Sequence, residues 1–343
     1  MSLTYTAYVS RRIIKYGGLG IIGIALLWTL GKLTFQIYRA IRPPYTPPTV
    51  KYGILNKMIF PEKDISKKNF SFEFANDEVP SFSDQARVYI IHRPNNSILA
   101  LEEAKKMAKK LDFSDEPIEI RAGIYQFKNE DNKTLRINVL DDSFKMAYPY
   151  LEDQMLLSPK SMPNKEEAIS KASASLNSAG KLTEVLENGE KVVSYLKIGE
   201  NGLKSTSSQA EANVAKVSFY REKLNELKIL SKNVDEASVS VLVSGSDVSE
   251  KKIIEINYKE LNLDREAYST YPIKTSSEAI ADLQSGNYWP VSDTDKGNVV
   301  IRDLYLAYFE PVTLTNYLQP IFVFVGDNDF VAYVPAVSDS YTD

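Results

Sequence analysis

The residues whose types and spacing could do chemistry are few, and Ser249 and Lys252 are the first candidates. Their spacing, Ser-x-x-Lys, is that of an acylating serine with an activating lysine. Such a site also needs companion motifs and a helix that starts at the serine, whereas Lys252 opens an alternating pattern typical of a strand. Only Lys-Thr-Ser at 274–276 resembles a companion motif. The sequence therefore favours a chance spacing over a catalytic pair.

Two acidic runs offer the oxygen ligands that calcium prefers. The run that begins at Asp293, Asp-Thr-Asp-Lys-Gly, resembles the start of a calcium loop. That loop needs an oxygen ligand at position five, glycine at six and glutamate at twelve, where this sequence has Gly297, Asn298 and Leu304. The second run, Asp-Asn-Asp at 327–329, falls at the tip of an expected hairpin, whose geometry favours these residue types. We therefore expect polar turns and no metal site.

Four lysines share one side of an expected helix, which follows a turn and helix cap at 94–97 and ends at about Leu111. We name them the lysine stripe: Lys105, Lys106, Lys109 and Lys110. The helical period places them opposite the apolar residues of that helix. A solvated helix face is the plain interpretation, and the sharper hypothesis is contact with anionic lipid or an acidic polymer at the cell surface.

Other catalytic and cofactor motifs are missing from the sequence. It has no glycine-rich phosphate loop, no His-Glu-x-x-His and no Gly-x-Ser-x-Gly. The absence of cysteine excludes disulfides, cysteine-ligated zinc and thiol nucleophiles, and the single histidine, His92, excludes any site that needs two. We expect no catalytic residues, no cofactor and no metal. A hydrolase that uses two carboxylates stays open, because such pairs need no fixed spacing.

The composition is that of a globular protein with many strands. Hydrophobic residues make up 43% and charged residues 25%, and tyrosine, which suits half-buried sheet surfaces, occurs 21 times. The net charge is −4, but it is unevenly distributed: residues 1–50 contain six basic and no acidic residues. The rest of the chain has 35 basic and 45 acidic residues, a net charge of −10. Because a net negative charge repels the phosphate backbone, we expect no nucleic-acid partner.

An apolar segment near the N-terminus predicts a transmembrane helix at 13–38, after a short basic tail at 1–12. Its 20–25 apolar residues suffice to cross a bilayer core of about 30 Å, with Lys15 and Lys32 near its two ends. A cleaved signal peptide would need a shorter core and a small-x-small cleavage site, and a buried core helix would not be apolar all round. Membrane lipid is thus the first expected partner.

The orientation of this helix is not decided by charge, because three basic residues lie on each side of the core. A short basic tail before a first hydrophobic segment commonly stays inside. We therefore expect the C-terminal body to be extracytoplasmic, in the cell envelope.

Beyond the membrane we expect a proline-containing stalk and irregular lead-in at 39–85, then three α+β units at 86–160, 161–265 and 266–343. Each unit contains a helix. The second helix, 165–179, follows Asn164 with Glu167 three residues later, as in a capping box, and the third is expected at about 276–284. The last unit ends in a hairpin. The strands are expected at 86–92, 118–127, 134–140, 143–151, 191–198, 214–222, 238–245, 252–261, 298–311, 320–326 and 330–337. The fold class is α+β, an N-terminal transmembrane helix followed by repeated helix-plus-antiparallel-meander units.

Helix-then-meander units entered by an x-Glu-Ala helix resemble PepSY-like domains of bacterial membrane proteins. Several stretches also resemble uncharacterised single-pass proteins of candidate-phyla (Patescibacteria-type) bacteria: 43–62, 86–113, 239–246 and 301–337. The resemblance covers most of the chain and is strongest in the last stretch. It implies a membrane-tethered α+β protein and carries no catalytic residues. By analogy with PepSY-like modules, it implies inhibition or regulation of a partner.

These observations favour a non-enzymatic, membrane-anchored interaction or regulatory module with a protein partner in the envelope. Two alternatives stay open. One is a cell-envelope hydrolase that uses Asp/Glu chemistry in a concave pocket. The other is a structural subunit of a larger membrane assembly, which would expose a sizeable apolar patch.

Overall fold

The structure, a computed structural model, describes residues 3–41, 45–61, 67–92, 99–157, 161–199, 202–233, 236–311 and 315–343. The chain forms two compact units, Met1–Pro48 and Thr49–Asp343. The turn and helix cap expected at 94–97 lie outside the described residues. The units combine a long apolar helix with largely antiparallel sheets, so the expected α+β class is confirmed.

The first unit contains the helix α1 (Leu3–Ile41). Its span Tyr5–Arg39 is the one described helix that is long and apolar enough to cross a membrane. Its large apolar side chains are exposed, Leu27 by 71%. The Lys32 ammonium lies 4.6 Å from the centre of the Trp28 ring, a pairing that suits a lipid headgroup layer. The helix already begins at Leu3, so most of the expected basic tail is helical, because basic side chains alone do not end a helix.

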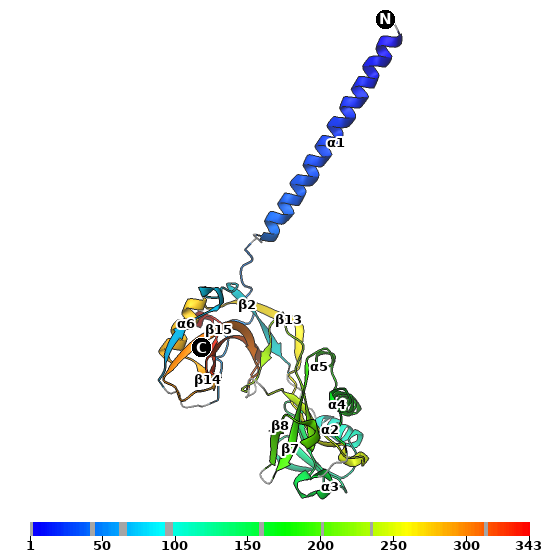
Figure 1. Cartoon of the computed structure of the whole chain (residues 1–343), viewed down its shortest axis with the longest axis vertical. Coiled ribbons are helices and arrows are strands. Elements are labelled where there is room, and N and C mark those ends of the chain that lie inside the picture. Colours follow the sequence, from blue (N-terminus) through cyan, green and yellow to red (C-terminus); the bar gives the residue numbers. More distant parts are fainter. Residues whose placement is uncertain are drawn as a thin grey trace. The chain divides into compact units, whose positions relative to one another are not determined.

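The described part of the second unit contains two sheets (Figure 1). One is antiparallel throughout, with the order β3-β4-β5-β6-β12-β11-β9-β7-β8. Its strands are β3 (Ile118–Arg121), β4 (Ile124–Lys128), β5 (Thr134–Asn138), β6 (Ser143–Ala147), β7 (Lys191–Gly199), β8 (Gly202–Thr206), β9 (Val214–Phe219), β11 (Val239–Ser244) and β12 (Ile253–Tyr258). We name it the nine-stranded sheet.

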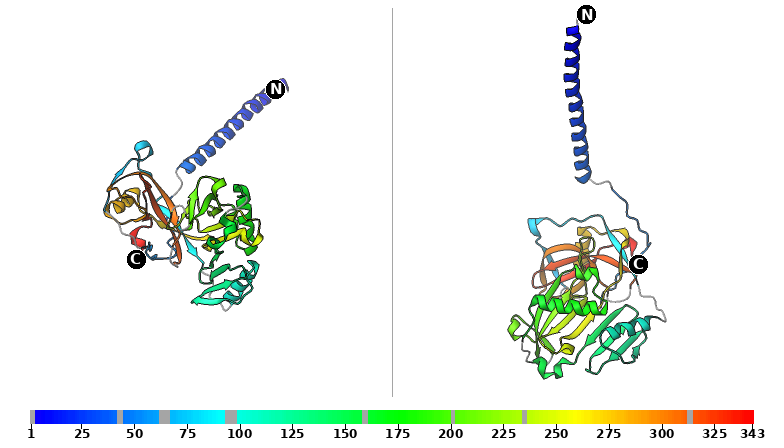
Figure 2. Two further views of the ribbon diagram at one scale, coloured as in Figure 1. Left: turned by 60° about the horizontal axis from the view of Figure 1, so that its bottom comes forward. Right: turned by 90° about the vertical axis from the view of Figure 1, so that its right-hand side faces the viewer.

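Two helices cover one face of the nine-stranded sheet, α2 (Leu99–Lys110) and α4 (Lys165–Ala179) (Figures 1 and 2). They share one core with six of its strands, and their contact residues are mainly alanines such as Ala108 and Ala172, which let the helices approach the sheet closely. A smaller core lies under the short helix α3 (Gln154–Leu157) and includes Leu156 and Leu242.

The ends of α4 follow from its sequence. Asn164 and Glu167 form the expected capping box, in which each side chain accepts from the other residue's backbone N–H. Gly180, with φ of 70°, ends the helix in the left-handed conformation that glycine adopts without strain. The short helix α5 (Glu184–Glu187) follows, with Thr183 as its N-cap residue.

The other sheet has eight strands in the described residues, with β1-β15-β16-β17-β14 as its main path. β15 (Asn298–Phe309) pairs in parallel with β1 (Asn69–Phe72) and β10 (Ile229–Leu230), and antiparallel with β16 (Tyr317–Gly326). The remaining strands pair antiparallel: β2 (Gln85–Ile91), β13 (Leu263–Pro272), β14 (Trp289–Ser292) and β17 (Val331–Pro335). Short 3-10 helices lie at Ala75–Asp77, Tyr150–Glu152, Gln209–Glu211, Ser249–Lys251 and Asp339–Tyr341.

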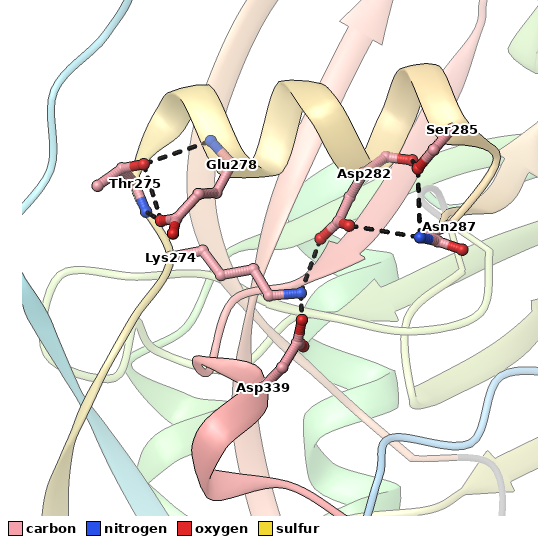
Figure 3. Close-up of polar contacts among 7 residues, drawn as sticks. All are labelled: Lys274, Thr275, Glu278, Asp282, Ser285, Asn287 and Asp339. Atoms are coloured by element: carbon pink, nitrogen blue, oxygen red, sulfur yellow. Dashed lines mark hydrogen bonds and ion pairs between the residues drawn. The ribbon is translucent and has the colours of Figure 1, made fainter.

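The helix α6 (Ser276–Ser285) packs Ala279 and Leu283 into the core of this second sheet. Thr275 and Glu278 form a second capping box (Figure 3). Beside it, the Lys274 ammonium bridges the carboxylates of Asp282 at 2.7 Å and Asp339 at 2.8 Å (Figure 3). This ion triad joins the helix to the C-terminal segment.

The lead-in after Pro48 belongs to the fold of the second unit. The Ser269 hydroxyl of β13 accepts from the backbone N–H of Lys51 and contacts the Thr49 hydroxyl, each at 2.8 Å. Farther on, the backbone N–H of Leu55 donates to the carbonyl of Tyr341 at 2.8 Å. The first residues of the unit are thus held by β13 and by the C-terminal segment.

Several details differ from the sequence-based expectation. The strand expected at 118–127 is a hairpin of β3 and β4, because Gly123 adopts a φ of 75° and turns the chain. The strand at 143–151 ends at Ala147, before Pro149. The ranges 86–160, 161–265 and 266–343 stay a prediction about folding units. Strands from different expected ranges pair with each other: β2 pairs with β13, and β6 pairs with β12.

Candidate binding cleft

A cleft of about 420 Å³ lies at one end of the nine-stranded sheet, where β12 leads into β13. We name it the central cleft. Its charged lining residues are Asp142, Lys181, Arg221, Glu222, Glu260 and Arg265. Its apolar walls are Val185, Leu224, Ile229, Leu261 and Leu263. A volume of this size, with apolar walls and a few convergent polar groups, is typical of a ligand site.

Strand register brings the charged residues to one end of the sheet. Phe219, Val239 and Tyr258 lie directly opposite one another across β9, β11 and β12. Arg221 and Glu260 each follow two residues after a member of this row. The positions at which these two strands end therefore place a guanidinium and a carboxylate in the same cleft.

Glu260 lies at the centre of a hydroxyl-rich group. Its carboxylate accepts a hydrogen bond from the Tyr258 hydroxyl at 2.6 Å and from the Thr183 hydroxyl at 2.9 Å. Thr183 is the N-cap residue of α5, yet its side chain makes no capping bond, because its hydroxyl is directed to Glu260. Burial, followed by the Glu260 charge, raises the pKa of Tyr258 well above its usual value. Tyr258 is therefore a neutral hydroxyl that donates to Glu260.

Arg221 is held by backbone carbonyls. Its guanidinium donates to the carbonyls of Lys259 and Leu261, each at 3.4 Å. Its Nε is buried and has no hydrogen-bond partner among the described residues. No described carboxylate forms an ion pair with this guanidinium. Arg221 therefore keeps hydrogen-bonding capacity that the described chain does not use.

The remaining charges of the central cleft are paired. The Lys181 ammonium forms an ion pair with Asp142 and lies 5.5 Å from the centre of the Tyr258 ring. The Arg265 guanidinium lies 2.7 Å from the Glu222 carboxylate. These pairs flank Glu260 and Arg221, which have no such partner among the described residues.

Two further cavities adjoin the central cleft through shared lining residues. One, of about 750 Å³, shares Lys181 and Glu260 and extends to His92 and α2; we name it the lysine end. The other, of about 670 Å³, shares Arg221 and extends to Tyr220 and Tyr305; we name it the tyrosine end. The three cavities are neighbours around Lys181, Glu260 and Arg221, and we refer to them together as the groove.

The lysine stripe is split by the structure. Its side chains lie opposite the buried residues of α2, as the helical period requires. Lys106 and Lys110 line the lysine end, whereas Lys105 pairs with Glu116 at 2.8 Å. Lys109 is exposed and does not line the groove. Contact of the stripe with anionic lipid or an acidic polymer stays a prediction.

The other candidate residues from the sequence have structural roles and do not form a catalytic or metal site among the described residues. Ser249 begins a 3-10 helix and Lys252 immediately precedes β12, so the helix that an acylating serine requires is not formed there. Asp327 is bound by the Arg302 guanidinium through two hydrogen bonds of 2.9 Å. Asn328 and Asp329 adopt φ of 59°, the conformation of a tight hairpin turn. Among the described residues, no group of three or more acidic or histidine side chains is arranged to hold a metal.

The loop that resembles a calcium site encloses a lysine. The Lys68 ammonium lies 2.9 Å from the Asp293 carboxylate and donates to the carbonyls of Thr294 and Lys296. Because the side chain of Lys68 is only 2% exposed, its ammonium occupies the polar centre of this loop.

Sequence reasoning missed Arg221 and Glu260. Each is the last but one residue of an expected strand, 214–222 or 252–261, and neither belongs to a motif. The only available signal was a charged residue at the end of an apolar strand, which is a common arrangement.

The chain is similar to two solved structures. One is an uncharacterized protein from Eubacterium rectale, at 13% identity over 80% of this chain and 88% of that chain, with a TM-score of 0.41. The other is the Bacillus megaterium YpeB C-terminal domain, at 13% identity over 72% of this chain and 95% of that chain, with a TM-score of 0.30. Comparison with protein-family models and with curated proteins finds no match.

Proposed function

We propose that this protein is a membrane-anchored interaction or regulatory module of the cell envelope and not an enzyme. α1 would anchor it in the bilayer, and the second unit would contact a protein partner on the extracytoplasmic side. The observation that carries the proposal is the central cleft, in which Arg221 and Glu260 have no ion-pair partner among the described residues. Charges of this kind suit recognition of a partner.

The arrangement of hydroxyls around Glu260 also favours binding over catalysis. Thr183 is the aliphatic hydroxyl bonded to a carboxylate there, but the Glu260 carboxylate is shared between Thr183 and Tyr258 and so is not dedicated to activating one nucleophile. The one lysine in the central cleft, Lys181, is paired with Asp142. A nucleophile and a matched base are therefore not combined there.

A carboxylate-pair hydrolase is the second candidate, because Asp142 and Glu260 line the same cleft. Such an enzyme needs one carboxyl group that stays protonated as a general acid. In the structure Asp142 is paired with the Lys181 ammonium and Glu260 accepts from two hydroxyls, so neither carboxyl group is placed as a proton donor. Hydrolysis of a cell-wall polymer by the wild-type protein, with loss of hydrolysis in Glu260→Gln, would replace the binding proposal with this one.

Affinity capture from detergent-solubilised native membranes tests the proposal. Wild-type protein is expected to recover an envelope protein, Glu260→Gln to recover several-fold less of it, and Glu211→Gln, an exposed glutamate outside the groove, to recover as much as wild type. Recovery of nothing above background by the wild type would contradict the proposal.

Sidedness is tested separately. Protease added to intact cells is expected to digest the second unit, with the same digestion pattern after the cells are opened. Protection of residues 49–343 in intact cells would place the body in the cytoplasm and contradict an envelope role.

A further inference from the structure

The central cleft contains both paired charges and charges without an ion-pair partner among the described residues. Lys181 has Asp142 and Arg265 has Glu222, whereas Arg221 and Glu260 form ion pairs with no described residue. Arg221 is bound only by neutral carbonyls and Glu260 only by neutral hydroxyls, so an opposite charge from outside would stabilise each of them further. The cleft therefore offers one positive and one negative group to a molecule from outside.

The two groups are held in a fixed relation to each other. The guanidinium of Arg221 binds the carbonyls of Lys259 and Leu261, the residues on either side of Glu260. The carboxylate of Glu260 is fixed in turn by Thr183 and Tyr258. Because this segment positions both charges before a ligand arrives, binding would require little reorganisation.

The groove is longer than a single small molecule needs. The central cleft alone has about 420 Å³, and the adjoining lysine and tyrosine ends have about 750 and 670 Å³. A ligand that contacts all three cavities is an extended chain. Leu224, Leu261 and Leu263 supply apolar wall beside the two charges, so the chain would have apolar as well as charged parts.

The charges along the groove select the type of chain. Its lining contains as many Asp and Glu as Lys and Arg residues. A polyanion would be repelled by the acidic half, and a neutral glycan would leave Arg221 and Glu260 unpaired. A peptide can present both signs of charge, and apolar side chains between them.

We propose that this groove binds an extended peptide segment of a partner protein, with an acidic side chain on Arg221 and a basic side chain on Glu260. Side chains two residues apart lie on the same face of an extended peptide, so the recognised pattern is Glu-x-Lys or its reverse. The apolar walls contact the residues next to this pair. This inference rests on the proposed function and names the element of the partner that is bound.

Fluorescence polarisation with defined peptide pools tests the inference. The probes are fluorescein-labelled decapeptides with central Glu-x-Lys or Lys-x-Glu and mixed Ala, Ser, Val and Tyr elsewhere, and matched pools with central Gln-x-Gln. Full-length protein in detergent is expected to bind a charged pool about tenfold more tightly than the neutral pool. Glu260→Gln, which keeps the shape of the side chain, is expected to lose most of this preference, and so is Arg221→Gln.

Matched variants control for general charge effects. Arg136→Gln changes an exposed arginine of β5, and Glu211→Gln changes an exposed glutamate; neither residue lines the groove, and both variants should bind as wild type does. If Arg221→Gln fails to fold, as judged by its thermal melting curve, the binding measured for Glu260→Gln decides the result.

Three results would overturn the inference. They are equal binding of charged and neutral pools, unchanged binding by Glu260→Gln, and tighter binding of free Glu-Lys dipeptide than of the decapeptides. Failure of every pool while affinity capture still recovers a partner that depends on Glu260 would reject the peptide and keep the proposed function. Failure of both experiments would reject both.

Discussion

The ammonium group of Lys68 lies 2.9 Å from the carboxylate of Asp293, inside a loop whose sequence resembles the start of a calcium site. The carbonyls of Thr294 and Lys296 complete the contacts, and the Lys68 side chain is 2% exposed. Carboxylate and carbonyl oxygens are the groups that bind a hard cation. Here the chain supplies that cation itself, from a residue far away in sequence.

Replacing Lys68 by Met should therefore destabilise the protein. The substitution keeps an unbranched chain but leaves Asp293 and two carbonyls without their donor, which costs about 2–4 kcal/mol. Urea unfolding of the full-length protein in detergent measures the loss. Lys67→Met, at the exposed neighbouring position, is the control and should change stability by less than about 0.5 kcal/mol. Equal stability of the two variants would show that the loop does not depend on the ammonium.

Gly189 should tolerate no side chain. A Cβ atom there would lie 1.8 Å from the backbone oxygen of Tyr220, so Gly189→Ala forces two backbone segments apart and should cost about 3 kcal/mol. At Gly297 a Cβ would meet no atom within 4 Å, so Gly297→Ala is the matched control. Thermal melting distinguishes the two, and melting temperatures within a degree of each other would contradict the close contact.

The capping box of α6 should contribute measurably to stability. Thr275→Ala removes the hydroxyl that accepts from the Glu278 N–H and donates to the Glu278 carboxylate, at a cost of about 1 kcal/mol. Thr275→Ser keeps the oxygen and should restore most of the loss. The midpoint of urea unfolding reports the difference, with an unchanged slope. A Ser variant as unstable as the Ala variant would instead point to the lost methyl group.

Asp153 should make stability depend on pH in the acid range. Burial alone would raise the pKa of Asp153, but hydrogen bonds from Lys251, Tyr148 and the backbone N–H of Met155 outweigh it, so the pKa lies below its usual 3.8. The folded protein therefore binds fewer protons than the unfolded chain near that pH, and the stabilisation is lost as pH falls through the folded-state pKa.

Asp153→Asn measures this contribution. Wild type is expected to exceed the variant by about 1–2 kcal/mol above about pH 5, and the difference should shrink below about pH 4. Urea unfolding at a series of pH values gives the comparison. A difference that stays constant down to the lowest pH would mean that Asp153 stabilises the fold without being charged.

The helices of this protein are well encoded in local sequence. Asn164 and Glu167 predict where α4 begins, and the observed helix, Lys165–Ala179, has the expected bounds. α6 ends one residue later than expected. Capping and the 3.6-residue period act within one or two turns, so a short window of sequence contains the information.

The strands are less well encoded, because their partners are distant. β13, whose sequence Leu-Asp-Arg-Glu-Ala-Tyr-Ser-Thr-Tyr-Pro has no clean alternation, was not expected, yet it pairs with β2. What makes it a strand is that distant partner. The candidate site was unpredictable for the same reason. Arg221 and Glu260 lie together only because β9, β11 and β12 are neighbours in that order.

The attachment of residues 49–51 to Ser269 and Thr270 also has a mechanical consequence. A pulling force that enters the second unit at Thr49 passes directly to β13, where it pairs with the distant strand β2, and bypasses residues 52–85. Tension on α1 would thus strain β13 and its partner β2 first, and β13 begins three residues after Glu260. In a membrane-anchored protein, that path would couple traction on the tether to the shape of the groove.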